Sequence, residues 1–262
     1  MKKASKELSG KKFDYRRIIG TILFVTLLFS IGYSLVCFLR APETPQEPHD
    51  KLKSDYGLML LQCTGGLIVM FLPSFVERKL SLRIPNYMFV LYFVFLYCAI
   101  YLGEVWSFYY RIPFWDMILH TFSGMMLGAL GFSLVSLLNS AENISVRLSP
   151  FFVAFFAFCF ALACGMIWEI YEFTVDGIAG MNMQKFALET GEPMIGREAL
   201  SDTMEDIIVD TAGAFVVSLL GFISLKLGRP LKTIRAKERN TDNAVDAPQD
   251  APVPPSDDKS DE

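Results

Sequence analysis

The sequence predicts an all-α, polytopic transmembrane helix bundle with six spans and both termini in the cytoplasm. Two observations predict the bundle: 52% of the 262 residues are hydrophobic, with 23 Phe among them, and long apolar runs recur along the chain. Soluble domains need more polar surface than this composition supplies. A third observation, the alternation of Lys and Arg between the connecting segments, predicts the orientation.

Six apolar runs are long enough to cross the roughly 30 Å of a bilayer core, which takes about 20 residues in a helix. Lipid offers the backbone no hydrogen bonds, so each run must pair its own peptide groups as a helix. Barrel strands are excluded, because they would alternate over about ten residues. The predicted spans are 18–39, 57–76, 87–106, 117–138, 151–175 and 206–227.

The segments outside the spans complete the domain organisation. The basic segment 1–17 precedes an apolar run that is too long for a signal-peptide core and lacks an A-x-A cleavage site, so we interpret the run as an uncleaved span. The membrane domain then covers 18–230. The remaining tail, 231–262, is acidic, Pro-rich and free of aromatic residues. We expect it to be disordered, because it cannot bury enough apolar surface to offset chain entropy.

Loop charges predict which side each end faces. Lys and Arg gather in 1–17, 77–86 and 226–239, and are sparse or balanced by acids in the alternate loops. By the positive-inside rule, these three segments and both termini are cytoplasmic. No basic patch with interleaved aromatic residues is present, so nucleic acid is not an expected partner. All five cysteines fall in apolar runs, which indicates buried thiols and no disulfide framework or zinc module.

Ionisable side chains interrupt the last three spans at one depth. In the predicted orientation each lies in the outer part of its helix, and Glu104, near the outer end of the third span, joins the same layer. The residues are Asp116 and His120 in the fourth span, Glu169, Glu172 and Asp176 in the fifth, and Asp202, Asp206 and Asp210 at the start of the sixth.

Within each span these residues are spaced by three or four positions, so they share one helix face. Each polar stripe continues into glycine, at Gly124 in the fourth span, Gly165 in the fifth and Gly213 in the sixth. Small residues allow membrane helices to approach closely. The pattern therefore predicts three helices packed around a shared polar cavity.

The unfavourable free energy of burying these carboxylates indicates that they have a function. One carboxylate at the centre of a membrane helix costs roughly 2.5–3.5 kcal/mol, and several together repel unless they protonate or share a cation. Carboxylate oxygens with one imidazole suit Mg, Mn or Ca, and less well Zn or Fe. The predicted metal ligands are His120, Glu169, Glu172, Asp206 and Asp210, with His120, Glu169 and Asp206 as catalytic acid–base groups and Asp116, Asp176 and Asp202 around them.

Several of these residues also have a structural interpretation. Asp202 with Glu205 is interpreted as a capping box at a helix start, which cannot explain Asp206 one turn further in. Asp116 is an alternative cap for the fourth span, and Asp176 and Glu104 either join the site or mark the membrane interface.

Four aromatic residues and two arginines flank the same layer. Trp106, Tyr109, Tyr110 and Trp115 are expected to form an outer aromatic belt. Arg111 and Arg197 are the expected cations nearest to the acids, and their loop positions argue against full internal pairing. The loop 179–201 is long enough to cover the cavity as a lid.

The motifs of the last three spans resemble a known family. They read W-D-x-x-x-H-x-x-x-G from Trp115 to Gly124, W-E-x-x-E-x-x-x-D from Trp168 to Asp176 and D-T-x-x-D-x-x-x-D from Asp202 to Asp210. This combination resembles the YjdF-like family of uncharacterised bacterial inner-membrane proteins. The likeness covers about residues 57–230 and is strongest over 115–215. It implies a multi-pass protein of the bacterial cytoplasmic membrane and supplies no reaction.

Three functions remain open from the sequence. The first is a divalent-cation site for membrane-embedded hydrolysis or transfer on a lipid-linked substrate, with membrane lipids as partners. The second is a cation or proton transporter, ranked lower because the inner halves of the last three spans offer only hydroxyls and glycines and no inverted repeat is visible. The third is a structural or sensory membrane protein whose acids pair internally.

Overall fold

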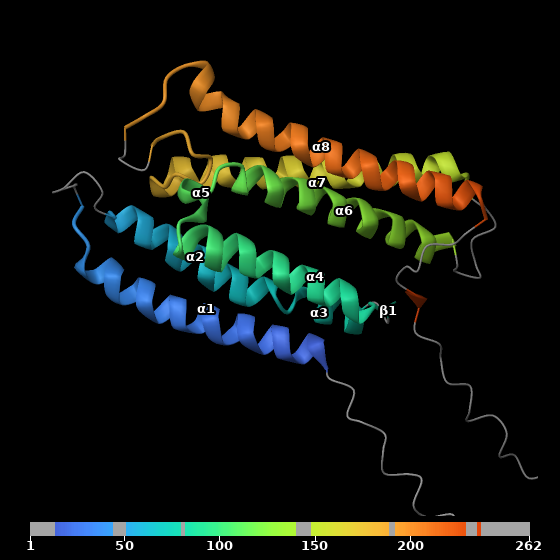
Figure 1. Cartoon of the computed structure of the whole chain (residues 1–262), viewed down its shortest axis with the longest axis horizontal. Helices are drawn as coiled ribbons and strands as arrows, with labels where there is room; N and C mark the ends of the chain where they lie inside the picture. The colour runs from blue at the N-terminus through green and yellow to red at the C-terminus, as the bar shows by residue number, and fades with distance from the viewer. Residues whose placement is uncertain are drawn as a thin grey trace, which may run out of the picture.

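The computed structural model describes residues 14–43, 51–79, 82–139, 148–188, 192–228 and 235–236, and almost all of them are helical (Figure 1). The helices are α1 (Tyr15–Arg40), α2 (Lys53–Val69), α3 (Leu72–Lys79), α4 (Asn86–Leu96), the π-helical η1 (Tyr97–Val105), α5 (Phe108–Arg111), α6 (Trp115–Asn139), α7 (Pro150–Ala179) and α8 (Arg197–Lys226). Two short strands, β1 (Leu82–Arg83) and β2 (Arg235–Ala236), pair antiparallel with Leu82 opposite Ala236.

The predicted six spans are confirmed by the helices. Among the described residues, six helical stretches are long and apolar enough to cross a membrane, with α2 and α3 forming one of them and α4 with η1 another. Pro73 explains the break between α2 and α3, because it lacks an N–H and its ring clashes with the carbonyl four residues earlier. The helix α7 begins at Pro150 after the cap Ser149, whose Oγ accepts from Phe152 N at 3.2 Å.

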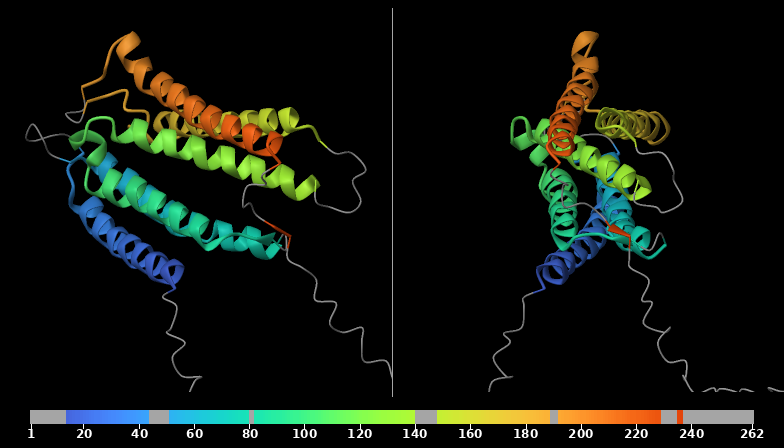
Figure 2. Two further views of the ribbon diagram at one scale, coloured as in Figure 1. Left: turned by 45° about the vertical axis from the view of Figure 1, so that its right-hand side comes forward. Right: turned by 90° about the vertical axis from the view of Figure 1, so that its right-hand side faces the viewer.

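The spans pack as two groups of three helices. In Figure 2, α1, α2 and α4 lie together, and α6, α7 and α8 form the second group beside them. The first group encloses an apolar cluster that includes Leu27, Met59 and Phe89. The second encloses another around Phe132 and Ala157. Each group therefore has its own core, and the acids predicted to form a site all belong to the second group.

Successive spans run in opposite directions, so the start of α1 and the end of α8 lie at the same end of the bundle (Figure 1). The loops before α6 and before α8 lie at the opposite end, which we call the site end. Which end faces the cytoplasm stays a prediction from loop charge. The predicted disordered tail lies outside the described residues, apart from Arg235 and Ala236 in β2.

Glycine sets the distance between α6 and α8. A Cβ atom on Gly124 would lie 2.4 Å from the backbone oxygen of Asp210, and one on Gly213 would lie 2.4 Å from the backbone oxygen of Thr121. Any side chain at either position would therefore push the two backbones apart. The close helix approach expected from the glycine pattern is present, and it fixes the distance across which the polar residues of α6 and α8 meet.

The start of α8 differs from the sequence prediction. The helix begins at Arg197, after Gly196 with φ 65°, and not near Asp202. Asp202 is therefore inside the helix, and the interpretation of Asp202 and Glu205 as a capping box was wrong. The sequence pattern was misleading because the first turns of α8 are polar, so they read as loop although they are helical. Asp116 lies in the first turn of α6, where a carboxylate suits the helix dipole.

Candidate functional site

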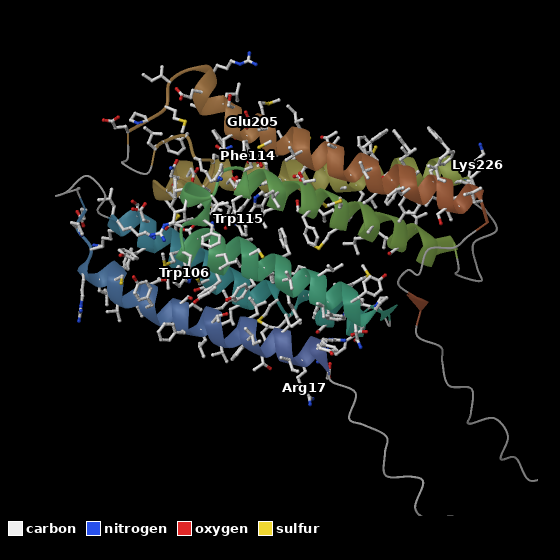
Figure 3. All side chains as sticks on the ribbon, in the orientation of Figure 1. Arg17, Trp106, Phe114, Trp115, Glu205 and Lys226 are labelled. Atoms are coloured by element: carbon white, nitrogen blue, oxygen red, sulfur yellow. The ribbon has the colours of Figure 1, made fainter. Side chains whose placement is uncertain are left out.

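Four predicted residues meet between α6 and α8, namely Asp116 and His120 of α6 and Asp206 and Asp210 of α8. Figure 3 labels Phe114 and Trp115 at the start of α6 and Lys226 at the far end of α8. His120 of α6 lies at the centre. Its Nδ1 is 3.2 Å from Asp210 Oδ2. Its Nε2 is 3.7 Å from Asp206 Oδ2 and 3.8 Å from Asp116 Oδ1. The side chains of His120, Asp206 and Asp210 are buried, as expected from their shared helix face.

The two ring nitrogens of His120 have different surroundings. When Nδ1 carries the proton, it donates to Asp210 and leaves the Nε2 lone pair facing Asp206 and Asp116. Asp210 is itself held in place, since Ser123 Oγ lies 2.7 Å from its Oδ1 and donates to it. On α7, a Cβ on Gly165 would lie 2.7 Å from Asp210 Oδ2, so the carboxylate packs against that glycine. Asp210 thus orients the imidazole, in the way that carboxylates orient metal-binding histidines.

The acids of α7 lie beside the same cluster of α6 and α8 residues. Glu169 is 5% exposed, and neither of its carboxyl oxygens has a hydrogen-bond partner among the described residues. Glu172 is also buried. Both carboxyl groups come near enough to His120 and Asp206 to interact with them electrostatically. The structure therefore brings all five predicted ligands into one buried region, with Glu169 the least satisfied of them.

Asp176 has a different role from its neighbours on α7. Its Oδ1 accepts from Met183 N at 2.7 Å, and its Oδ2 accepts from Gln184 N at 2.9 Å. Both oxygens are thus engaged by the backbone that follows α7, where Gly180 ends the helix with φ 63°. Asp176 anchors the connection between α7 and α8, whose described residues, 180–188 and 192–196, we call the α7–α8 loop.

The α7–α8 loop carries a cation that the sequence analysis missed. The ammonium of Lys185 forms an ion pair with Asp116, and its side chain is 15% exposed. The ammonium also lies 4.6 Å from the centroid of the Tyr109 ring. Arg111 and Arg197, the cations expected nearest the acids, are exposed. Lys185 was missed because nothing in the local pattern shows that the loop folds back onto α6.

Two groups outside the spans respond to this environment. Burial lowers the pKa of Lys185, and the nearby carboxylates of Asp202 and Asp206 oppose that shift. Burial, together with neighbouring acids, raises the pKa of Tyr109 well above its usual value, so this phenol stays neutral. Tyr109 therefore belongs to the wall of the site, whereas Trp106 and Tyr110 are exposed as a belt requires.

Glu104 lies at the edge of this layer. It interacts electrostatically with Lys51 and Asp55 of the first helix group as well as with Lys185. Asp202 is half-buried and also interacts with Lys185. Both carboxyl groups therefore lie near Lys185, and neither forms a hydrogen bond or ion pair with His120 among the described residues.

Replacing Asp176 by alanine is expected to open the α7–α8 loop. The change leaves the amides of Met183 and Gln184 without their acceptor, and a hydrogen bond to a charged group contributes about 1.5–3 kcal/mol. Hydrogen exchange of the peptide covering 181–188 should accelerate while the spans stay protected. Glu192→Ala, which removes an exposed carboxylate from the same loop, is the matched control. Equal exchange in the two variants would show that Asp176 does not anchor the loop.

Three residues of this site could hold a divalent cation. Asp116, His120 and Asp206 each offer one ligand atom, and these atoms all lie within 4.8 Å of one another. Carboxylate oxygens suit Mg and Mn, and an imidazole nitrogen beside carboxylates suits Zn and Fe. The partnerless oxygens of Glu169 agree with this fit, because a buried carboxyl group without a partner is unfavourable unless a bound group satisfies it.

Comparison with known proteins supports the membrane assignment. Residues 18–227 match a family model described as a predicted membrane protein, DUF2238. A Thermotoga maritima protein described as uncharacterized is 28% identical over 123 residues, which is 45% of this chain and 52% of that protein. The chain thus spans about half the length of that relative. No solved structure matches the chain.

Proposed function

The chain belongs to the DUF2238 family of predicted membrane proteins, and we propose that it binds a divalent cation between α6 and α8 and uses it in membrane-embedded hydrolysis or transfer. Multi-pass membrane insertion follows from the six apolar spans. The cation and the reaction are the proposal. It includes the finer likeness to YjdF-like proteins and a location in the bacterial cytoplasmic membrane, in keeping with the bacterial source of the Thermotoga relative.

One observation carries the proposal. His120 is oriented through Nδ1 by a carboxylate that Ser123 holds, and it turns Nε2 toward two further carboxylates. Packing alone does not require this arrangement, since a buried histidine needs only one partner for each nitrogen. An oriented imidazole with two acids on its other side is what a cation site requires.

The residues divide by position into binding and proton-transfer groups. Nε2 of His120, Asp206 and Asp116 would hold the cation, with Asp210 orienting the imidazole. A bound divalent cation would lower the pKa of a coordinated water and polarise a substrate oxygen. Glu169, with both oxygens unpaired in the buried layer, is suited to accept a proton from water. Glu172 lies one turn further along the same buried face of α7.

The depth of the site suggests the substrate class. The site lies near the end of the spans, at the depth where the polar head of a lipid would lie. It does not lie at mid-membrane. A lipid-linked substrate could reach it from the bilayer with its apolar part remaining in lipid. Membrane lipids are therefore the proposed partners, and an ester or phosphate linkage near a lipid head is the proposed point of attack.

Metal analysis of the purified protein tests the cation. We expect wild-type protein to retain Mn²⁺ or another divalent cation stoichiometrically, and Glu169→Gln/Asp206→Asn to retain little. The double substitution removes negative charge from the centre of the site while nearly keeping side-chain volume. Glu198→Gln/Glu205→Gln, at exposed positions of α8, is the matched control. An equal and negligible metal content in wild type and the site variant would contradict the proposal that the site binds a cation.

A second candidate is favoured by one observation. Lys185 supplies an internal partner for Asp116 that the sequence did not reveal. In a non-catalytic structural or sensory protein, this ion pair would account for the buried carboxylate of Asp116. A non-catalytic role does not explain why both carboxyl oxygens of Glu169 lack a hydrogen-bond partner among the described residues. Turnover of lipid-linked phosphates by detergent-purified protein, with divalent cation added and then chelated, separates the two functions.

A further inference from the structure

The backbone of the α7–α8 loop holds Lys185 over the site by several independent contacts. Asp176 accepts from the two amides just before the lysine. The side chain of Asn182 bonds both backbone groups of Ala187, at 2.7 and 3.0 Å. Gln184 Nε2 donates to Thr203 Oγ1 on α8 at 2.9 Å. The loop is therefore tied to α7, to α8 and to itself on either side of position 185.

Lys185 is kept at this position against a backbone preference. Its φ is 49°, in the left-handed region where residues other than glycine are uncommon and strained. Glycine would occupy the position without strain, but it would supply no charge. The strain and the burial are both explained if the ammonium itself is what the position requires.

The ammonium contacts the same carboxylate that the proposed cation would use. Asp116 pairs with Lys185, and Asp116 also shares the Nε2 side of His120 with Asp206. A lysine ammonium and a divalent cation at one carboxylate repel each other strongly in a poorly solvated place. Occupancy of Asp116 by one therefore disfavours the other.

We propose that Lys185 is a tethered cation that occupies Asp116 when the site holds no metal, and that cation binding displaces it and releases the α7–α8 loop. The inference rests on the proposed cation site and adds its regulation. Coupling between two sites is reciprocal, so a loop that disfavours the cation is loosened by the cation to the same degree. Access to the buried acids is thereby linked to cation occupancy.

Mn²⁺ affinity of protein in lipid nanodiscs tests the competition. Lys185→Met keeps the length and apolar stem and removes the charge, so we expect Mn²⁺ to bind about 10-fold more tightly, within the range usual for coupled sites. Lys185→Arg keeps the charge and should retain wild-type affinity. Lys226→Met, at the opposite end of α8, is the matched control and should also bind as wild type (Figure 3).

Hydrogen exchange of the wild-type protein tests the release without any substitution. Loss of the ion pair between Lys185 and Asp116 removes one of the contacts that hold the loop, and the hydrogen bonds of Asp176, Asn182 and Gln184 then hold it alone. We therefore expect Mn²⁺ to accelerate exchange of the amides of Met183 and Gln184, and expect these amides in Lys185→Met to exchange faster than in metal-free wild type, with or without Mn²⁺. Unchanged Mn²⁺ affinity in Lys185→Met, or a loop in wild type that does not respond to bound Mn²⁺, would overturn the inference and leave the cation site intact. If wild-type protein bound no Mn²⁺ at all, the proposed function itself would fail.

Discussion

His120→Ala is expected to abolish divalent-cation binding and to destabilise the second helix group. The imidazole is the nitrogen donor among the acids of the site and the group that Asp210 orients. Loss of a partner in the outer shell of a metal site typically weakens binding roughly 10–100-fold, and loss of a ligand should exceed that. Removing one partner from a buried charged pair also costs about 3–5 kcal/mol. Titration with Mn²⁺ and SDS-induced unfolding measure the two effects.

Two control variants separate these effects. His49→Ala removes the other histidine of the chain, which lies outside the described residues, and should leave Mn²⁺ binding unchanged. Ser123→Ala removes a hydroxyl that bonds Asp210 Oδ1 and the backbone oxygen of His120 but leaves the imidazole in place, so it should weaken binding less than His120→Ala does. Wild-type Mn²⁺ binding by folded His120→Ala would show that the imidazole is not a ligand.

The sequence was sufficient for the membrane spans and for the shared face of the acids. Both depend on local regularities, namely the length of an apolar run and the three- and four-residue spacing of a helix. His120, Asp206 and Asp210 therefore meet as their spacing predicts. The same regularities could not show that α8 starts at Arg197, because a polar first turn looks like loop until its packing is known.

The roles of individual acids depend on non-local structure. Asp176 and Glu172 share one helix face, yet Asp176 bonds the backbone of the next loop and Glu172 stays beside the site. Lys185 reaches Asp116 only because that loop folds back over α6. No spacing rule relates Lys185 on this loop to Asp116 on a helix 69 positions earlier in the chain. The assignment of Asp116 and Asp210 to different nitrogens of His120 likewise needed coordinates.

Gly124→Ala is expected to disrupt both packing and site, whereas Gly128→Ala, one turn further along the same interface, should be tolerated. A Cβ on Gly124 would lie 2.4 Å from the backbone oxygen of Asp210, but one on Gly128 would lie 3.5 Å from its nearest neighbour, an ordinary contact. Overpacking typically costs about 1–3 kcal/mol. Alanine in place of an uncrowded helical glycine contributes about 0.5–1 kcal/mol of stability.

Gly124→Ala should also reduce cation affinity, because α6 must move away from α8 to relieve the clash between the new Cβ and the backbone oxygen of Asp210. His120 lies on α6 and Asp210 on α8, and Nδ1 of the histidine is 3.2 Å from Oδ2 of the aspartate. Even a small separation of the two helices therefore breaks this hydrogen bond. Gly124→Ala should therefore lower stability and Mn²⁺ affinity together, with both near wild type or better in Gly128→Ala. Equal stability of the two variants in SDS titrations would contradict the helix contact at Gly124. Weakened stability with unchanged Mn²⁺ affinity would show that the bond between His120 and Asp210 is dispensable for binding, because the helix contact would then be lost while the cation site remained.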